Sequence, residues 1–191
     1  NISWWSAMED SSRDSKRFQQ ERFILSQLLV MALKGVPAFY LPALLGSEND
    51  IKRFSMTGER RDLNREKFDF DKLLIQLEDK NSIASKNLKI LSNAMTVRSK
   101  LKSFHPSQEM KCLTKGRSDI VAIQRGVENN SIFAIHNFTD KKLNFSIDDD
   151  LNFSLKDVFT YCDYLTSKEY INLNFILEPF QVLWIGKKIN D

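Results

Sequence analysis

Apolar residues recur at helical spacing in the first part of the chain, over residues 12–33. Their intervals of three, four and seven positions place them on one face of a helix, which the free backbone of Gly35 would end. The apolar run that follows, residues 36–41, predicts a short strand buried on both faces. Such strands occur in parallel sheets that are covered by helices, so this part of the chain is expected to be α/β.

Two further helices are predicted over residues 68–77 and 81–104, with Asn81 as the cap of the second helix and Pro106 beyond its end. After Pro106 the period changes from helical to alternating, which predicts an antiparallel β-sandwich. Its aromatic side chains mostly fall on core positions: Phe133, Phe138, Phe145, Phe153, Phe159, Phe175 and Trp184. The expected strands cover residues 119–125, 131–137, 143–147, 155–162, 173–177 and 181–185, with a turn at 167–170.

Residues 46–65 carry many charges and show neither a helical nor a strand period. This predicts a structureless loop of about twenty residues, and such loops in compact proteins are usually functional or disordered. In an α/β barrel, the loops that follow strands build the active site. The order of predicted strand, polar loop and helix therefore places candidate chemistry in this stretch.

Two segments of this region carry a resemblance to a known family. GVPAFYLPALLGSEND and TGERRDLNREKF resemble the eighth strand and following loop of the sucrose and glucosylglycerate phosphorylases in glycoside hydrolase family 13, the α-amylase superfamily. NISWWSA resembles the segment entering the last part of their barrel, and IFAIHNFTDKK and LEPFQVLWIGK resemble strands of their C-terminal β domain. The resemblance implies that residues 1–107 are the last βα elements of a TIM (β/α)8 barrel and that residues 108–191 form a β-sandwich domain.

The resemblance also implies a reaction, the retaining transfer of an α-glucosyl unit, and a set of substrate-binding residues. Arg65 matches the arginine at the bottom of the donor-sugar subsite, and Arg61 matches an earlier arginine that holds the loop. Asn64 and Asp50 complete the substrate-binding set. The family's catalytic Asp, Glu and Asp come from earlier strands that this chain does not contain, so no catalytic residue is predicted here and the fragment alone is expected to be inactive.

The leaving group and acceptor remain open at this stage. Cationic residues around the loop suit inorganic phosphate or the carboxylate of glycerate, but they equally suit neighbouring acidic residues. The extra Glu59 and Arg60 depart from the usual sucrose phosphorylase motif and favour a glucosylglycerate type. Trp4 and Trp5 are either a core plug or a stacking platform for an acceptor sugar.

Composition and charge exclude several other classes. The 28 basic and 25 acidic residues give a net charge of +3 without a long basic block, which disfavours nucleic-acid binding. Cys112 and Cys162 are too few for a disulfide scaffold and lack metal-ligand spacing, so no metal or cofactor is predicted. The chain has no apolar run of membrane-spanning length and no signal-peptide pattern, which predicts a cytoplasmic protein without a membrane partner.

Two alternative functions stay open on the sequence alone. The chain could be a noncatalytic β-sandwich module that binds carbohydrate or braces a partner, or part of a family 13 glucosidase or amylase-type hydrolase. A nucleic-acid-binding β-barrel is disfavoured by the acidic run at residues 148–150. The leading hypothesis is a phosphorylase whose partners are a small carbohydrate, inorganic phosphate and an upstream barrel of the same polypeptide.

Overall fold

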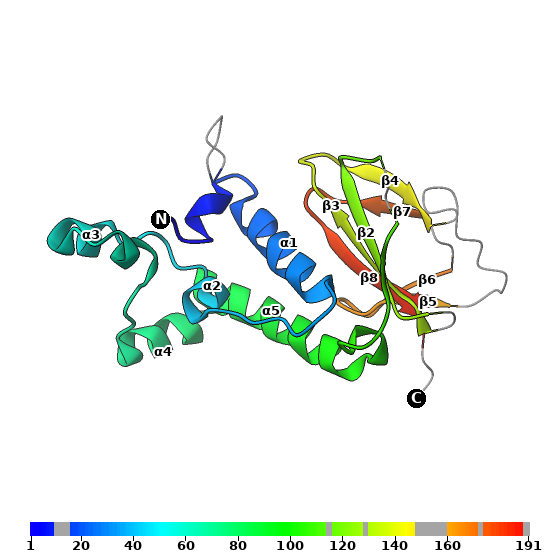
Figure 1. Cartoon of the computed structure of the whole chain (residues 1–191), viewed down its shortest axis with the longest axis horizontal. Coiled ribbons are helices and arrows are strands. Elements are labelled where there is room, and N and C mark those ends of the chain that lie inside the picture. The colour runs from blue at the N-terminus through cyan, green and yellow to red at the C-terminus, as the bar shows by residue number, and fades with distance from the viewer. Residues whose placement is uncertain (10–15, 114–115, 128–129, 148–159, 172–173, 189–191) are drawn as a thin grey trace. The chain divides into compact units, whose positions relative to one another are not determined.

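A computed structural model describes residues 1–9, 16–113, 116–127, 130–147, 160–171 and 174–188 of the chain. Helices occupy the first part and strands the second (Figure 1). The chain divides into two compact units, the first made of Asn1–Ile24 and Ala38–Ser92 and the second of Leu25–Pro37 and Asn93–Asp191. The helices α1 (Gln19–Ala32) and α5 (Ile83–Lys100) each contribute residues to both units.

The first unit is helical and holds the region that the sequence singled out. The 3-10 helix η1 (Ser6–Met8) precedes α1 in this unit. Between α1 and α5 the unit contains the α-helices α2 (Leu41–Leu45), α3 (Ile51–Thr57) and α4 (Phe70–Glu78) and the 3-10 helix η2 (Arg60–Asn64). Helices over residues 68–77 and 81–104 were expected, and α4 and α5 confirm both of them. The hydroxyl of Ser82, and not the side chain of Asn81, accepts the backbone N–H of Ser85 and caps α5.

The second unit is built on an antiparallel sheet of six strands in the order β1-β2-β3-β8-β5-β6, with β4 and β7 paired as a separate ribbon. Their bounds are β1 (Met110–Cys112), β2 (Ile120–Arg125), β3 (Ile132–Asn137), β4 (Leu143–Ser146), β5 (Tyr161–Asp163), β6 (Lys168–Tyr170), β7 (Asn174–Leu177) and β8 (Val182–Lys187). The antiparallel β region after Pro106 is thus confirmed, with a two-stranded ribbon as the second layer in the described part.

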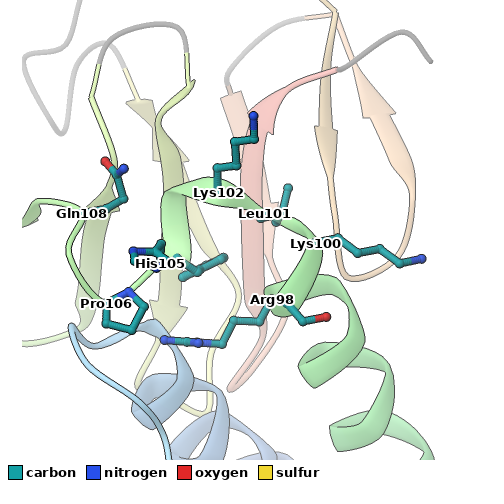
Figure 2. Close-up of a pocket in the computed structure, with 9 residues that line it drawn as sticks. Arg98, Lys100, Leu101, Lys102, His105, Pro106 and Gln108 are labelled. Carbon is teal, nitrogen blue, oxygen red and sulfur yellow. The ribbon is translucent and has the colours of Figure 1, made fainter.

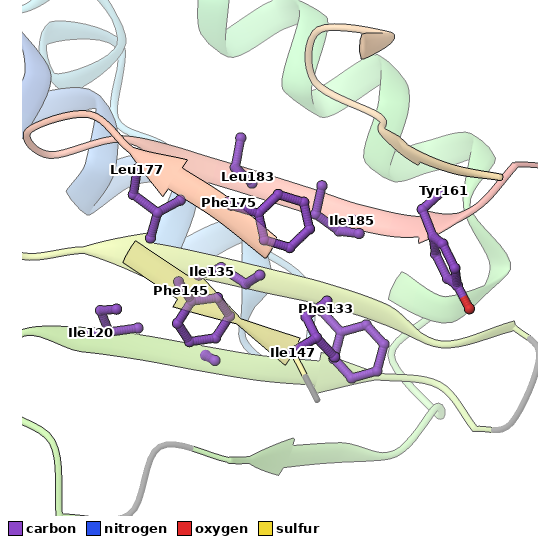
Figure 3. Close-up of a cluster of buried hydrophobic side chains, with 11 residues drawn as sticks. Ile120, Phe133, Ile135, Phe145, Ile147, Tyr161, Phe175, Leu177, Leu183 and Ile185 are labelled. Carbon is purple, nitrogen blue, oxygen red and sulfur yellow. The ribbon is translucent and has the colours of Figure 1, made fainter. Parts of the chain in front are cut away.

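One face of this sheet packs against the ribbon and forms a hydrophobic core. Figure 3 shows Phe145 of β4 and Phe175 of β7 pointing at the isoleucines of the sheet, among them Ile135 of β3. Phe133, Phe145, Phe175 and Trp184 are buried as predicted. Phe138 is exposed, and Phe153 and Phe159 lie outside the described residues.

The other face of the sheet is covered as well, so every residue of the central strand β3 is buried. Trp184 of β8 packs against Phe104 of the 3-10 helix η3 (Lys102–Phe104), with ring centroids 4.7 Å apart. Beside them Arg125 of β2, which is fully buried, donates from Nη1 to the carbonyl oxygens of Ala32 and Leu33 at the end of α1. The second half of α1 is therefore fastened to the sheet through its own last carbonyls.

The strand predicted at residues 36–41 is not formed. Residues 36–40 have no strand pairing, Leu41 is the first residue of α2, and 80% of Val36 is exposed. A strand requires neighbours that satisfy its N–H and C=O groups. In the described part of the chain every strand lies at or after Met110, so no neighbour is present. An apolar run favours burial, but it does not supply the partner strands that burial in a sheet requires.

The edge strands β1 and β6 were missed, and residues 167–170 were wrongly predicted as a turn. Both strands are three residues long and largely exposed, and they occupy the two outer positions of the sheet. Edge strands have one pairing partner and few buried side chains, so they show no alternation of polar and apolar residues. Their existence depends on the neighbouring strand.

Candidate functional site

The loop predicted at residues 46–65 contains a short helix and a 3-10 turn, which corrects the expectation of a structureless stretch. Asp50 begins α3 as its N-cap, because its carboxylate accepts the backbone N–H of Arg53 at 2.9 Å. Gly58 ends α3 in the left-handed conformation. The backbone N–H of Asp50 donates to the carbonyl of Leu63 at 2.8 Å, which ties the start of α3 to η2.

An ion pair makes a second link between the same two elements. Nη2 of Arg53 lies 2.9 Å from the carboxylate of Asp62, and both side chains are half-buried. Hydrogen bonds from the side chains of Arg53 and Thr57 lower the pKa of Asp62. Because the pair joins α3 to η2, it fixes the turn on which Arg61 and Asn64 stand.

The N-terminal segment also forms hydrogen bonds with residues 46–65. The amide oxygen of Asn49 accepts the backbone N–H of Ser3 at 2.7 Å, and the backbone N–H of Asn49 donates to Oγ of Ser6 at 3.1 Å. The side chain of Asn1 donates to the carbonyl of Arg60 at 2.8 Å. Asn49 was not selected from the sequence as a site residue, although its place beside Asp50 in the matched motif was an available signal.

Of the four predicted substrate-binding residues, one uses its side chain to cap a helix, and the other three have side chains that could bind a ligand. Asp50 is committed to helix capping, so its carboxylate supports the loop. Arg61, Asn64 and Arg65 lie within or directly after η2, where both arginines are exposed and Asn64 is half-buried. Among the described residues, no hydrogen bond or ion pair is recorded for the side chains of these three. The arrangement presents two cationic forks and one amide that can donate to hydroxyl or anionic groups.

Gly46, the first residue of the stretch 46–65, packs closely against Asn87 and Trp5. It has φ +73°, and a Cβ atom placed on it would overlap Nδ2 of Asn87 and lie 2.9 Å from the ring of Trp5. Trp5 is a core residue with 3% of its surface exposed, and it meets Phe23 edge-on with ring centroids 5.2 Å apart. The core-plug interpretation is therefore right for Trp5, whereas Trp4 is 48% exposed.

We expect Gly46→Ala to destabilise the protein more than Gly58→Ala does. Both glycines have positive φ, of +73° and +67°, so each alanine incurs a backbone penalty of about 1–2 kcal/mol. Only at Gly46 would the new methyl group overlap its neighbours, which adds about 1–3 kcal/mol. Urea unfolding of the two variants measures the difference, and equal losses of stability would contradict the close packing at Gly46.

The described residues offer neither a metal site nor a membrane span. No cluster of three or more His, Cys, Asp or Glu side chains there has the arrangement of a metal site. None of the helices in this part of the structure has the length and apolar character needed to span a bilayer.

Comparison with known proteins gives a consistent result. No protein-family profile matches the chain. Glucosylglycerate phosphorylase of Escherichia coli is 26% identical over 186 residues, which cover 97% of this chain and 31% of that enzyme. Glucosylglycerate phosphorylase of Allomeiothermus silvanus is 30% identical over 131 residues, which cover 69% of this chain and 23% of that enzyme. The chain thus spans less than a third of the length of these relatives.

A solved structure extends the comparison to the fold. The crystal structure of AmyP in complex with maltose superposes with a TM-score of 0.67 at 14% identity, covering 95% of this chain and 37% of that one. At this identity the likeness shows only that the chain shares its fold with part of AmyP. The comparisons confirm the resemblance that the motifs indicated: the chain is similar to glucosylglycerate phosphorylases and consistent with the C-terminal part of a phosphorylase-type enzyme of glycoside hydrolase family 13.

Proposed function

We propose that the chain is the C-terminal part of a retaining α-glucosyl-transferring phosphorylase and that η2 forms one wall of its donor-sugar pocket. In this proposal residues 1–107 complete a (β/α)8 barrel, residues 108–191 form the β domain, and the protein is cytoplasmic. The similarity to glucosylglycerate phosphorylases over 97% of the chain is the observation that carries the proposal.

The exposed apolar surface of the first unit supports an upstream barrel as partner. In the described structure α4 has no buried residue, although it is strongly amphipathic, and Phe70 and Ile75 are 71% and 67% exposed. An amphipathic helix normally buries its apolar face against another element. A barrel contributed by the rest of the polypeptide would cover this face.

The extended segment before α2 supports the same partner. Residues 36–40 are unpaired, and Tyr40 has the backbone dihedrals of a strand, with φ −83° and ψ 134°. The carbonyl of Tyr40 accepts the backbone N–H of Leu44, whereas residues 36–39 make no backbone hydrogen bond within the described structure. The N–H and C=O groups of residues 36–39 would pair with neighbouring strands in a complete barrel. We propose that this segment becomes a buried barrel strand only in that context.

The chemistry of the loop fits a binding role and not a catalytic one. A retaining transfer needs one carboxylate as nucleophile and another as acid and then base. Asp50 caps α3 and Asp62 pairs with Arg53, so neither carboxylate is free to attack a sugar. The catalytic carboxylates in the proposal come from the upstream barrel, and the fragment by itself is inactive.

Glucosylglycerate is the favoured substrate, with inorganic phosphate as acceptor of the glucosyl unit. Glucosylglycerate phosphorylases from three species match the chain. Arg61 and Arg65 are exposed and have no recorded ionic partner among the described residues, so they are available to anionic or hydroxyl groups. Sucrose phosphorolysis and hydrolysis are the competing activities, and product analysis with each donor in the presence and absence of phosphate separates them.

We expect Arg65→Ala in the full-length enzyme to lower kcat/KM by about ten- to a hundredfold. Charge-assisted hydrogen bonds from the guanidinium to the donor sugar contribute about 1.5–3 kcal/mol each, and every 1.4 kcal/mol corresponds to roughly a factor of ten. Arg65→Lys should restore only part of the loss, because an ammonium group cannot reproduce the planar fork. Steady-state kinetics with glucosylglycerate measure both effects.

Lys67→Ala is the matched control, since Lys67 is an exposed cation close to Arg65 in the chain. It should leave kcat/KM within about twofold, and the melting temperatures of all variants should agree. If Arg65→Ala stays within about threefold of the unmodified enzyme, Arg65 does not line the pocket.

A further inference from the structure

A pocket of about 480 Å³ lies where α5 ends and η3 begins, within the second unit (Figure 2). Its lining is formed by Arg98, Ser99, Lys100, Leu101, Lys102, Phe104, His105, Pro106 and Gln108. Three of these side chains are permanently cationic and a fourth is a histidine, whereas none is a carboxylate. The chain as a whole carries nearly as many acidic as basic residues, 25 against 28, so this lining departs from the average surface.

One of the cations is held rigidly. Arg98 donates from Nε to the carbonyl of Met31 at 2.9 Å and from Nη2 to the carbonyl of Gly35 at 2.8 Å. Its guanidinium also lies 5.6 Å from the ring centroid of Phe104. For Nη1, no partner is recorded within the described ranges. A guanidinium fixed on one edge and open on the other loses little freedom when it binds an anion.

The remaining polar groups of the pocket are mostly donors. Nδ1 of His105 lies 2.7 Å from Oγ of Ser107 and accepts the backbone N–H of Ser107 at 3.3 Å, so Ser107 holds this edge of the ring. Nε2 is the ring nitrogen that is left to meet a ligand. Lys100 and Lys102 are exposed, and neither forms an ion pair with a described residue. Gln108 adds an amide that can donate. Figure 2 shows Lys102 and Gln108 rising on either side of His105.

We propose that this pocket binds a small anion of the phosphate class, either free inorganic phosphate or a phosphate monoester. Its volume lies in the range that holds small molecules, and its donors match the acceptor oxygens of a phosphate group. Arg98 provides the fixed contact, and the exposed Lys102 and His105 provide further donors of the same lining. The proposal rests only on the second unit and is independent of the donor-sugar pocket.

A purely structural role for the lysines is the competing explanation. Cations near the end of a helix complement its macrodipole without binding any ligand. The two explanations differ in what neutralisation of the lysines changes: a ligand site loses affinity for phosphate, whereas a dipole interaction loses only a little helix stability.

The test is a calorimetric titration of the protein with inorganic phosphate and, separately, with glycerol 3-phosphate at low ionic strength. We expect saturable binding with a Kd of about 1 mM or tighter for at least one probe. The double variant Lys100→Gln/Lys102→Gln should weaken it at least about fivefold, and added salt should weaken it further. Tighter binding of glycerol 3-phosphate than of phosphate identifies a monoester as the ligand, and the reverse identifies the free ion.

Lys89→Gln is the matched control, because it removes an exposed positive charge from α5 outside the pocket. It should leave both titrations unchanged. Absence of saturable binding, or binding that the double variant does not weaken, overturns the proposal. If the double variant has a lower melting temperature but binds phosphate as well as the unmodified protein, the lysines act on the helix dipole and not on a ligand.

Discussion

Replacing Arg125 by methionine is expected to lower the free energy of unfolding by roughly 3–5 kcal/mol, the largest effect that we expect of any single substitution. The guanidinium is fully buried and donates to four carbonyl oxygens, those of Ala32, Leu33, His105 and Glu109. Methionine matches the hydrocarbon stem but donates nothing, so buried carbonyls of α1 would lose their partner. Each unsatisfied buried acceptor costs about 1–3 kcal/mol.

Arg125 forms no ion pair with a carboxylate in the described part of the chain, so its buried charge is stabilised by carbonyl oxygens. Arg125 and Arg98 both bind the last carbonyls of α1 and flank Phe104, each with its guanidinium 5.6 Å from the ring centroid. Burial and the neighbouring Arg98 lower the pKa of Arg125. The negative end of the helix dipole, and not an acidic residue, offsets these costs.

Equilibrium urea unfolding of the second unit measures the effect, with Arg117→Met as the matched control. Arg117 forms a partly exposed ion pair with Asp119 at 2.7 Å, and such pairs contribute about 1 kcal/mol or less. Arg125→Lys should retain part of the stability, because an ammonium group reaches fewer of the carbonyls. A loss below about 1 kcal/mol for Arg125→Met would contradict the role of these hydrogen bonds.

Acidification from pH 7 to pH 4 is expected to destabilise the protein by up to about 3 kcal/mol through His136 alone. This side chain is buried in β3, and burial lowers its pKa from 6.5 to about 4. Its Nδ1 lies 3.2 Å from the carbonyl of Val121, which accepts the proton of the neutral ring. For Nε2, no partner is recorded in the described residues, so a second proton would be added to a buried site.

The sign follows from which state binds the proton. Between pH 6.5 and about 4 the unfolded chain protonates this histidine and the folded chain does not, so stability falls as the pH falls through that window. At about 1.4 kcal/mol for each pH unit, the interval amounts to about 3 kcal/mol. Asp163 acts in the opposite direction at low pH, because burial raises the pKa of its carboxyl.

A comparison with His136→Asn separates the two contributions. Asparagine can donate to the carbonyl of Val121 but does not titrate, and it leaves Asp163 unchanged. Unfolding free energies of both proteins at a series of pH values should diverge at neutral pH and converge towards pH 4, as the native histidine loses its advantage. Parallel curves over this range would show that His136 binds its proton equally in the folded and unfolded states, which would contradict the lowered pKa.

The sequence by itself determined the elements whose signal is local. The period of apolar residues located α1, α4, α5 and the strands β2, β3 and β8, because each of these segments buries a face that repeats at its own spacing. The spacing of Gly58, Arg61, Asn64 and Arg65 also carried the resemblance to glucosylglycerate phosphorylases, since a motif is a property of the chain and needs no coordinates.

Which of two neighbouring residues is buried, and what the charged residues bind, could not be predicted from the sequence. Trp4 and Trp5 are adjacent residues of the same type, yet of the two only Trp5 is buried, where it packs against Phe23. Asp50 caps a helix, and Arg125 enters the interior because the end of α1 presents carbonyl oxygens to it. The apolar run at residues 36–41 stayed unpaired, since a strand is completed by hydrogen bonds to other strands. These outcomes depend on contacts between segments distant in the chain, which local spacing does not encode.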